Sequence, residues 1–164
     1  MMEELNIEFG CGELPRQSTY KTCDIRNLPG IDYVCKAWEI DKLVAENSVD
    51  NIYSRHFFEH LTFAQGEIVL TVWYKILKPK GKILMLLPDL DFHVKQWLDG
   101  TDTEHACAGL FGWQRGELED LWDVHKSGYS FETLKKAFED AGFVNFSRHK
   151  ASKEHLKISA FKPE

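Results

Sequence analysis

The stretch Ile7-Glu8-Phe9-Gly10-Cys11-Gly12 decides the fold, because a short apolar run passes directly into a pair of glycines. Glycines allow the main chain to turn sharply, and the free backbone amides of such a turn can bind an anionic group of a ligand. A second apolar run ends in Asp24, where a carboxylate can accept hydrogen bonds from both hydroxyls of a ribose. These features predict two neighbouring strands with a ribose-containing ligand at their carboxyl ends.

Short apolar runs of this kind continue along the chain and alternate with helical patterns. That alternation predicts a single α/β domain over 1–164, with a doubly wound, mainly parallel, seven-stranded Rossmann-like sheet. The last two runs are separated by a few polar residues only, which predicts a C-terminal antiparallel hairpin. The expected strands are Leu5 to Phe9, Tyr20 to Asp24, Asp32 to Cys35, Asn51 to Ser54, Lys82 to Leu87, Phe143 to Arg148 and Leu156 to Phe161.

Two amphipathic helices are expected between these strands. Apolar residues recur at helical spacing over 64–77. Ser130 is a suitable N-cap for a helix over 131–141, and Gly142 supplies its left-handed C-terminal cap. The run Ile83-Leu84-Met85-Leu86-Leu87 does not alternate with polar residues, as expected of a central strand covered on both faces.

Composition and charge exclude several classes of protein. The 164 residues include 20 Lys and Arg against 26 Asp and Glu, which gives a net charge of −6. A protein that binds the phosphate backbone of nucleic acids needs a dense cationic face instead. We therefore expect no nucleic-acid partner. The longest strongly apolar run, 83–88, is far shorter than the ~20 residues that cross a bilayer, and the start of the chain lacks the basic region of a signal peptide. We expect no membrane span and a cytoplasmic protein.

The stretch from Asp89 to Gly128 is the least regular part of the chain. It combines aromatic residues with glycines and carboxylates, a mixture that favours a segment covering a cleft. The alternative is that these aromatic residues complete the core. They are Phe92, Trp97, Phe111, Trp113 and Trp122.

Four motifs occur in the order and spacing of a known family. They are Ile7-Glu8-Phe9-Gly10-Cys11-Gly12, Cys23-Asp24-Ile25, Ser48-Val49-Asp50-Asn51-Ile52-Tyr53 and Leu77-Lys78-Pro79-Lys80-Gly81-Lys82. Over nearly the whole chain they resemble the class I S-adenosylmethionine-dependent methyltransferases. Three further segments, 55–61, 87–91 and 123–125, are similar to a subgroup associated with surface-polysaccharide or glycan biosynthesis.

The resemblance implies which residues hold the cofactor, S-adenosylmethionine. Those at its methionine end would be Glu8, Phe9 and the loop of Gly10, Cys11 and Gly12, with His56 facing the methyl-donor end. Those at its adenosine end would be Asp24 on the ribose hydroxyls and Ile25 against the adenine. The family often has an acid that touches the adenine at the end of the third strand, where this chain has Lys36-Ala37-Trp38, and Trp38 could stack on the base instead.

The chain departs from the family pattern around this site. Leu14 replaces the third glycine of the usual loop, and Asp24 follows Gly12 by 12 positions instead of the ~20 of a dinucleotide-binding unit. The first crossover helix is therefore expected to be shortened or lost. The first expected strand begins at or before Leu5, which leaves no helices ahead of it to cover the acceptor site. The cover must then come from the segment Asp89 to Gly128, a large substrate or a second subunit, as in a homodimer.

Methyl transfer from a sulfonium needs an acceptor atom held in line with the sulfur–methyl bond and the exclusion of water. A base is needed only where the acceptor must lose a proton, and imidazole or carboxylate can accept it. The candidates are His125, which ranks first through the subgroup likeness, His56, Asp89 facing the acceptor, and His93.

The segment His56-Phe57-Phe58-Glu59-His60 also fits the pattern H-x-x-E-H, in which two histidines on one helical face bind zinc. Because this segment directly follows a predicted strand, His56 is expected at a strand-to-helix junction and not within a helix. We therefore expect no metal from this motif.

The expected activity is methyl transfer from S-adenosylmethionine to a small-molecule or glycan-linked acceptor, where the acceptor rests on analogy alone. Two alternatives remain. The domain could bind the cofactor without transferring methyl, as a partner subunit or sensor, or it could bind a nicotinamide dinucleotide.

Overall fold

The computed structural model of the chain describes residues 4–114 and 121–164. Its seven strands form one sheet in the order β3-β2-β1-β4-β5-β7-β6. All neighbours pair in parallel except β7, which is antiparallel to both β5 and β6. The strands are β1 (Asn6–Phe9), β2 (Lys21–Asp24), β3 (Tyr33–Val34), β4 (Val49–Arg55), β5 (Leu77–Pro88), β6 (Val144–His149) and β7 (His155–Phe161).

This topology confirms the predicted mainly parallel, doubly wound sheet with a C-terminal antiparallel hairpin. From β1 the chain runs outward through β2 to β3, then returns to the other side of β1 with β4. The strand order therefore reverses between β1 and β4. Strand β5 is longer than expected, since the lysine-rich turn 78–82 is part of it.

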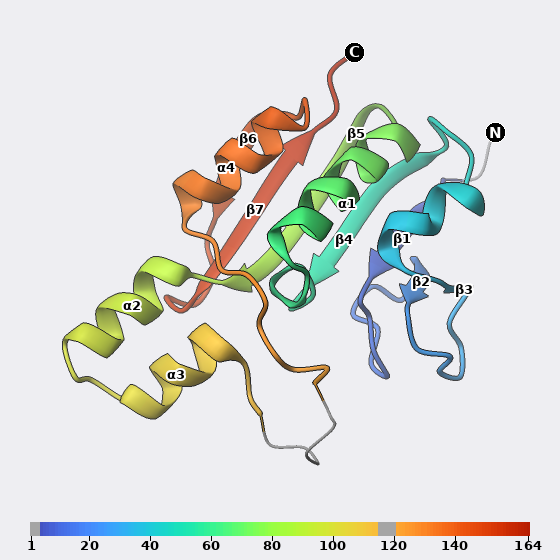
Figure 1. Ribbon diagram of the computed structural model, residues 1–164. Coiled ribbons are helices and arrows are strands. Elements are labelled where there is room, and N and C mark those ends of the chain that lie inside the picture. Colours follow the sequence, from blue (N-terminus) through green and yellow to red (C-terminus); the bar gives the residue numbers. More distant parts are fainter. Residues whose placement is uncertain (1–3, 115–120) are drawn as a thin grey trace.

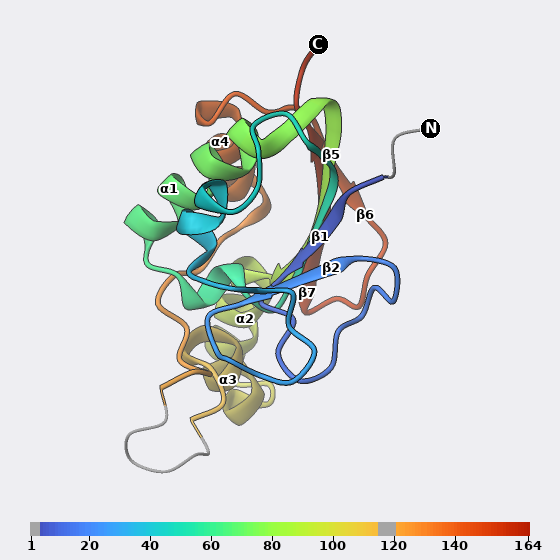
Figure 2. The ribbon, with the colours of Figure 1, turned by 90° about the vertical axis from the view of Figure 1, so that its right-hand side faces the viewer.

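Three of the described helices cover one face of the sheet, as Figures 1 and 2 show. They are η1 (Ala37–Lys42), α1 (Phe63–Ile76) and α4 (Phe131–Asp140). Helix α1 begins one residue before the prediction, behind a capping box of Thr62 and Gln65. Helix α4 begins behind the predicted cap Ser130. The core between these helices and the sheet includes fully buried Trp73, Ile83 and Met85.

The opposite face of the sheet carries loops in place of helices in the described connections 10–20 and 25–32 (Figure 2). The predicted loss of the first crossover helix is therefore confirmed. The expectation that 83–87 is covered on both faces was wrong, because Leu84 and Leu86 on the open face are only half-buried. The missing helices have a simple cause: the connections 10–20 and 25–32 are too short to hold both a turn and a helix that returns along the strand.

Two further helices, α2 (Leu90–Leu98) and α3 (Thr103–Phe111), pack against each other beyond the carboxyl end of β5 (Figure 1). With the described part of 112–128 they form the irregular segment seen in the sequence, of which 115–120 lies outside the described residues. Its aromatic residues Trp97, Phe111, Trp113 and Trp122 are exposed, between 42% and 58%, so they do not complete the core. Among the described residues, no helix has the length and apolar character that a bilayer crossing demands.

Candidate functional site

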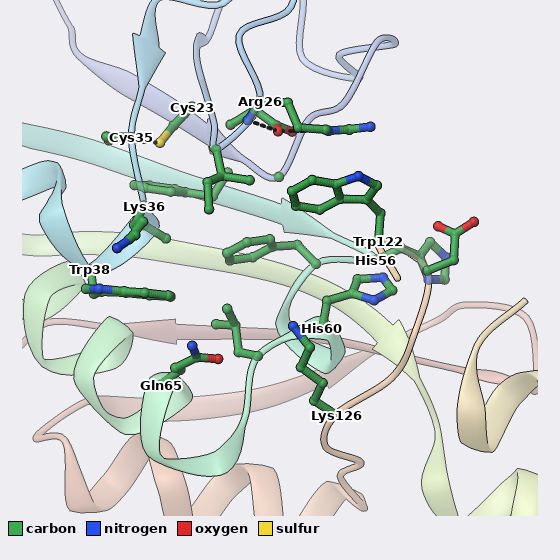
Figure 3. Close-up of a pocket in the computed structure, with 18 of the residues that line it drawn as sticks. Cys23, Arg26, Cys35, Lys36, Trp38, His56, His60, Gln65, Trp122 and Lys126 are labelled. Atoms are coloured by element: carbon green, nitrogen blue, oxygen red, sulfur yellow. Dashed lines mark hydrogen bonds and ion pairs between the residues drawn. The ribbon is translucent and has the colours of Figure 1, made fainter. Parts of the chain in front are cut away.

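A pocket of about 460 Å³, here called the edge pocket, opens at the carboxyl ends of β1 to β4. Open α/β sheets bind their ligands where the strand order reverses, because the loops of the two halves diverge there. Figure 3 shows side chains that project into the edge pocket from the strand ends and from the 121–126 segment. Its lining includes Gly10, Asp24, Ile25, Trp38, His56 and Trp122.

The glycine turn at the end of β1 is closed by contacts within the chain. The N–H of Gly10 donates to the carbonyl of Cys23 at 2.9 Å, and the N–H of Gly12 donates to Oδ2 of Asp24 at 2.9 Å. Both glycines have positive φ, +64° and +60°, and a Cβ on Gly10 would overlap the ring of Phe57. These glycines therefore serve the turn and the close packing of Phe57, and both amides already have acceptors.

Asp24, predicted to bind a ribose, lies at the edge pocket and is 6% exposed. Besides Gly12, it accepts hydrogen bonds at Oδ1 from the backbone N–H of Arg26 at 2.9 Å and from Nε of Arg26 at 3.2 Å. Burial raises the pKa of the Asp24 carboxyl, but these hydrogen bonds and the charge of Arg26 outweigh it, so the pKa lies below its ordinary value. Asp24 is therefore an ionised acceptor held in a fixed orientation.

Glu8, predicted at the methionine end of a cofactor, is 2% exposed. Its carboxylate accepts the backbone N–H groups of Arg16 and Gln17 at 2.8 to 3.0 Å. It lies with Cys11 in a smaller pocket beside the edge pocket, and burial raises the pKa of the Cys11 thiol to about 11. The structure thus places Glu8 and Cys11 behind the glycine turn, where Glu8 holds the loop that replaces the missing helix.

Aromatic side chains form two opposite walls of the edge pocket (Figure 3). Trp38 from η1 lies on one side, with Nζ of Lys36 at 5.9 Å from its ring centre. Trp122 lies on the other side, with the guanidinium of Arg26 at 5.8 Å from its ring centre. Both rings line the edge pocket, and Trp122 comes from the segment predicted to cover a cleft.

A second cavity of about 390 Å³, here called the histidine pocket, adjoins the edge pocket and shares His56, His60 and Asp123 with it. The chain has 7 histidines, and all except His149 line this cavity. Three pairs of rings lie in contact, with centroids 4.8 to 5.2 Å apart. The pairs are His56 with His155, His60 with His125, and His93 with His105.

Backbone carbonyls orient two of these imidazoles. Nδ1 of His60 lies 3.0 Å from the carbonyl of Val124, and Nδ1 of His125 lies 2.9 Å from the carbonyl of Gly109. Because a carbonyl only accepts, each Nδ1 carries the proton and each Nε2 keeps its lone pair. Burial lowers the pKa of His125, an effect that the carboxylate of Glu59 partly offsets.

His56 lies between β4 and η2 (Phe58–His60), at the strand-to-helix junction that the sequence predicted, in a left-handed conformation with φ +46°. It lines both pockets. Its Nδ1 lies 3.2 Å from Oε1 of Glu59, which follows on η2. Glu59 is 1% exposed, and its Oε2 has no hydrogen-bond partner among the described residues. A carboxylate thus orients the imidazole that faces the edge pocket.

The structure does not bring Asp89 into this arrangement. Its Oδ1 caps α2 by accepting the N–H of Asp91 at 3.1 Å, and its Oδ2 accepts Nη2 of Arg148 at 2.7 Å. Asp89 is 4% exposed and is absent from the described linings of both cavities, which the adjacent Pro88 enters instead. Of the four residues predicted as candidates for the base, His56, His93 and His125 line one cavity and Asp89 does not.

Sequence reasoning did not assign a site role to Arg26, Gln65, Trp122 or Lys126, which also line the edge pocket. Their neighbours in sequence give no pattern that marks them. Glu59 and His60 did carry a signal, the H-x-x-E-H motif, but the structure pairs His60 with His125 and leaves His56 outside a helix. Only the approach of distant segments brings these groups together.

No protein-family model and no curated protein sequence matches this chain. Solved structures do match over nearly its whole length. One is an S-adenosylmethionine-dependent methyltransferase from Archaeoglobus fulgidus, with a TM-score of 0.64, 16% identity, and coverage of 97% of this chain and 86% of that one. Another is such a methyltransferase from Thermotoga maritima, described as a possible histamine N-methyltransferase, with a TM-score of 0.69, 14% identity, and coverage of 99% and 83%.

A third match is phosphoethanolamine N-methyltransferase 2 from Haemonchus contortus in complex with S-adenosyl-L-methionine, with a TM-score of 0.63 and 15% identity. It covers 100% of this chain, which spans 50% of that protein. These comparisons give no support to the narrower likeness to the glycan-associated subgroup. The sheet order, the edge pocket and the structural matches agree: the chain has the fold of the class I S-adenosylmethionine-dependent methyltransferases.

Proposed function

We propose that this chain binds S-adenosylmethionine in the edge pocket and transfers its methyl group to a small acceptor in the histidine pocket. The observation that carries the proposal is the position of Asp24 at the end of β2, in a pocket that Trp38 and Trp122 also line and beside the reversal of the strand order. An acid at this place suits ribose hydroxyls, and aromatic side chains suit adenine.

Asp24 retains capacity to bind a ribose. A carboxylate offers about four lone-pair sites, of which Gly12 and the two donors of Arg26 occupy three. A ribose hydroxyl takes the remaining site, and a second one displaces Nε of Arg26, which is half-buried. The adenine then packs between Ile25 and Trp38, and Trp122 closes the pocket from the other side.

The acceptor is assigned to the histidine pocket because the two cavities share His56, His60 and Asp123. A ligand there faces the methyl-donor end of a cofactor in the edge pocket. Described residues of α2, α3 and the stretch 121–128 line this cavity, among them His93, Gly109 and His125, and they would form part of the wall over the acceptor. The cavity volume, about 390 Å³, fits a small molecule or the terminal unit of a glycan.

In the transfer step, an acceptor heteroatom attacks the methyl carbon in line with the sulfur–carbon bond. That bond breaks, and its electron pair stays on sulfur, which leaves as the neutral thioether of S-adenosylhomocysteine. Where the acceptor carries a proton, Nε2 of His56 accepts it, while Oε1 of Glu59 holds Nδ1 and stabilises the imidazolium. The protein thus supplies position, exclusion of water and one proton acceptor.

Isothermal titration calorimetry tests the cofactor assignment. Wild-type protein is expected to bind S-adenosylmethionine and S-adenosylhomocysteine with one site, and NADH with none. Asp24→Ala weakens binding by about 1 to 3 kcal/mol, since a buried hydrogen-bonding partner is lost. The matched control is Asp41→Ala, which removes a carboxylate paired with Lys75 outside the pocket. No heat with either adenosyl compound, or preferential binding of NADH, refutes the proposal.

Incubation with labelled S-adenosylmethionine and a pool of small metabolites separates an enzyme from a binding subunit. Label in an acceptor that His56→Gln fails to produce, with cofactor affinity unchanged, supports transfer. Saturable binding without transfer to any acceptor, with and without candidate partner proteins, assigns the chain to the non-catalytic class.

A further inference from the structure

The histidine pocket has the composition of a metal site. Six imidazoles line it together with the carboxylates of Glu59, Asp123 and Glu154. None of the described residues in its lining is Lys or Arg. Among the described lining residues, these carboxylates therefore have no Lys or Arg beside them, and a bound cation would balance their charge.

Two histidines make the hydrogen bond that typically accompanies metal binding. Val124 and Gly109 hold Nδ1 of His60 and of His125 by their carbonyls, so Nε2 of each ring keeps its lone pair. A metal-binding histidine in proteins almost always donates its other N–H to a carbonyl or carboxylate, which fixes the ring. The rings lie edge to face with centroids 5.1 Å apart.

Glu59 adds a carboxylate that lacks a partner. It is 1% exposed, and its Oε2 is buried without a hydrogen bond among the described residues, while Oε1 holds His56. A buried, unpaired carboxylate oxygen is costly, and coordination of a cation removes this cost. This observation is independent of the histidines and indicates a ligand at the same point.

One ligand atom from each of Glu59, His60 and His125 lies within 4.8 Å of the others. Around a tetrahedral ion with bonds of about 2.0 to 2.1 Å, ligand atoms are about 3.3 Å apart. The three side chains must therefore approach one another by about 1.5 Å at most. Small rotations about the χ angles of the three side chains bring their ligand atoms this much closer together.

We propose that Glu59, His60 and His125 bind a divalent transition-metal ion, with Zn²⁺ as the first candidate. Two imidazoles and one carboxylate form a donor set that holds Zn²⁺ in catalytic sites, where a fourth position stays open for water or a ligand. This site differs from the H-x-x-E-H reading of the sequence, in which His56 and His60 are the ligands and the glutamate is a base. Here Glu59 is a ligand, and His125 replaces His56.

A fourth ligand of an ion held by these residues would come from the histidine pocket, which adjoins the edge pocket. A hydroxyl, amine or thiol of an acceptor bound to the ion would be held next to the methyl donor, and the ion would lower the pKa of that group. This role rests on the proposed methyl transfer. The binding of the ion does not, and the two are tested separately.

The test uses full-length, tag-free protein freed of metal with a chelator. Zn²⁺ is titrated by calorimetry, and Co²⁺ by the visible absorption that tetrahedral Co²⁺ gives with nitrogen and oxygen ligands. We expect one site per chain with a dissociation constant below about 10 μM and a rise in melting temperature on Zn²⁺ addition.

The variants are Glu59→Gln, His60→Gln and His125→Gln, each expected to weaken Zn²⁺ binding at least about 100-fold, which exceeds the usual loss from an outer hydrogen bond. The control is His149→Gln, which removes the one histidine outside the cavity, bonded to Ser159. Circular dichroism confirms that each variant is folded, and His125→Asp restores Co²⁺ absorption in part because a carboxylate can replace an imidazole.

Failure of wild-type protein to bind Zn²⁺ or Co²⁺ with a dissociation constant below about 10 μM overturns the proposal, as does equal loss of binding in His149→Gln. Full retention of binding in all three ligand variants does the same. Calorimetry with S-adenosylhomocysteine on metal-free protein and on His125→Gln is run alongside. Cofactor binding without metal binding refutes the metal site alone, and metal binding without cofactor binding refutes the proposed function alone.

Discussion

The imidazoles of His60 and His125 meet edge to face with their centroids 5.1 Å apart, although one follows β4 and the other belongs to the segment after α3. Each is fixed by a backbone carbonyl from the irregular segment, Val124 for His60 and Gly109 for His125. The segment that covers the sheet edge therefore both encloses the histidine pocket and orients its side chains.

The glycine turn yields a prediction with an internal control. Gly10 and Gly12 have nearly the same positive φ, but a Cβ on Gly10 overlaps the Phe57 ring, whereas a Cβ on Gly12 lies 3.1 Å from the mobile end of Arg26. Gly12→Ala should cost about 1 to 2 kcal/mol of unfolding free energy from φ alone, and Gly10→Ala about 1 to 3 kcal/mol more from overpacking. Urea unfolding measures both. Equal losses contradict the packing of Phe57 on Gly10.

Gly109 on α3 is expected to be intolerant of alanine. A Cβ there would overlap the ring of His93, and the Gly109 carbonyl orients His125. Alanine in a helix normally stabilises by about 1 kcal/mol relative to glycine, so the sign of the change is diagnostic. We expect Gly109→Ala to lower the free energy of unfolding by about 1 to 3 kcal/mol. A gain in stability would show that His93 does not pack on α3 as described.

Trp122 is expected to retain the cofactor in the edge pocket. Its ring lies against the guanidinium of Arg26 across the pocket mouth. Trp122→Ala should weaken S-adenosylhomocysteine binding by about 0.5 to 2 kcal/mol, mainly through faster dissociation, because an aromatic wall and a cation–π contact are lost. Stopped-flow kinetics measure the rates. Trp97→Ala removes an exposed tryptophan on α2, outside the described lining, and should leave them unchanged.

Asp89 is predicted to stabilise the fold and not to contact substrate. Asp89→Asn keeps the cap on α2 but removes the charge that binds Arg148. We expect a loss of about 1 to 2 kcal/mol in unfolding free energy, at the lower end of charged hydrogen bonds because Arg148 is half-exposed, with unchanged cofactor affinity. Loss of methyl transfer in a variant that keeps its stability would instead return Asp89 to the catalytic residues.

Mild acid should destabilise the protein through His93 and His155. Burial lowers the pKa of His93, helped by the charge of His105, while Gln96, a backbone contact of Glu154 and Asp89 act in the opposite direction. Burial likewise lowers the pKa of His155, helped by His56, His93 and Arg55 and opposed by Glu154. In the native protein both imidazoles thus remain neutral at a pH where the unfolded chain is already protonated.

The sign follows from this difference. The stabilisation is complete above the unfolded pKa of about 6.5 and is lost as the pH falls from there toward the native pKa. The slope reaches at most about 1.4 kcal/mol per pH unit for each histidine. Urea unfolding of metal-free protein between pH 7.5 and 5 measures it. His155→Gln should flatten the profile, and His149→Gln, outside the pocket, should keep the wild-type slope; a flat wild-type profile contradicts the prediction.

Sequence reasoning located every strand of the sheet and both long helices, because these depend on local patterns. The apolar run before Gly10, the cap Ser130 and the stop at Gly142 act within a few residues of where they stand. The placement of Gly10, Asp24 and His56 at one edge was also predictable, since carboxyl ends of parallel strands share an edge. The prediction that 83–87 is covered on both faces failed, because an apolar run has the same sequence pattern whether or not a helix covers both of its faces.

The sequence alone determined the class of fold and the edge of the sheet at which the edge pocket opens, since periodicity, glycines and chain order are local properties. Tertiary structure decided which carboxylates already have partners within the protein. The backbone N–H groups of Arg16 and Gln17 donate to Glu8, and the guanidinium of Arg148 donates to Asp89. It also decided the histidine pocket, where six imidazoles from widely separated segments converge. Such convergence depends on the packing of distant elements, which no local pattern encodes.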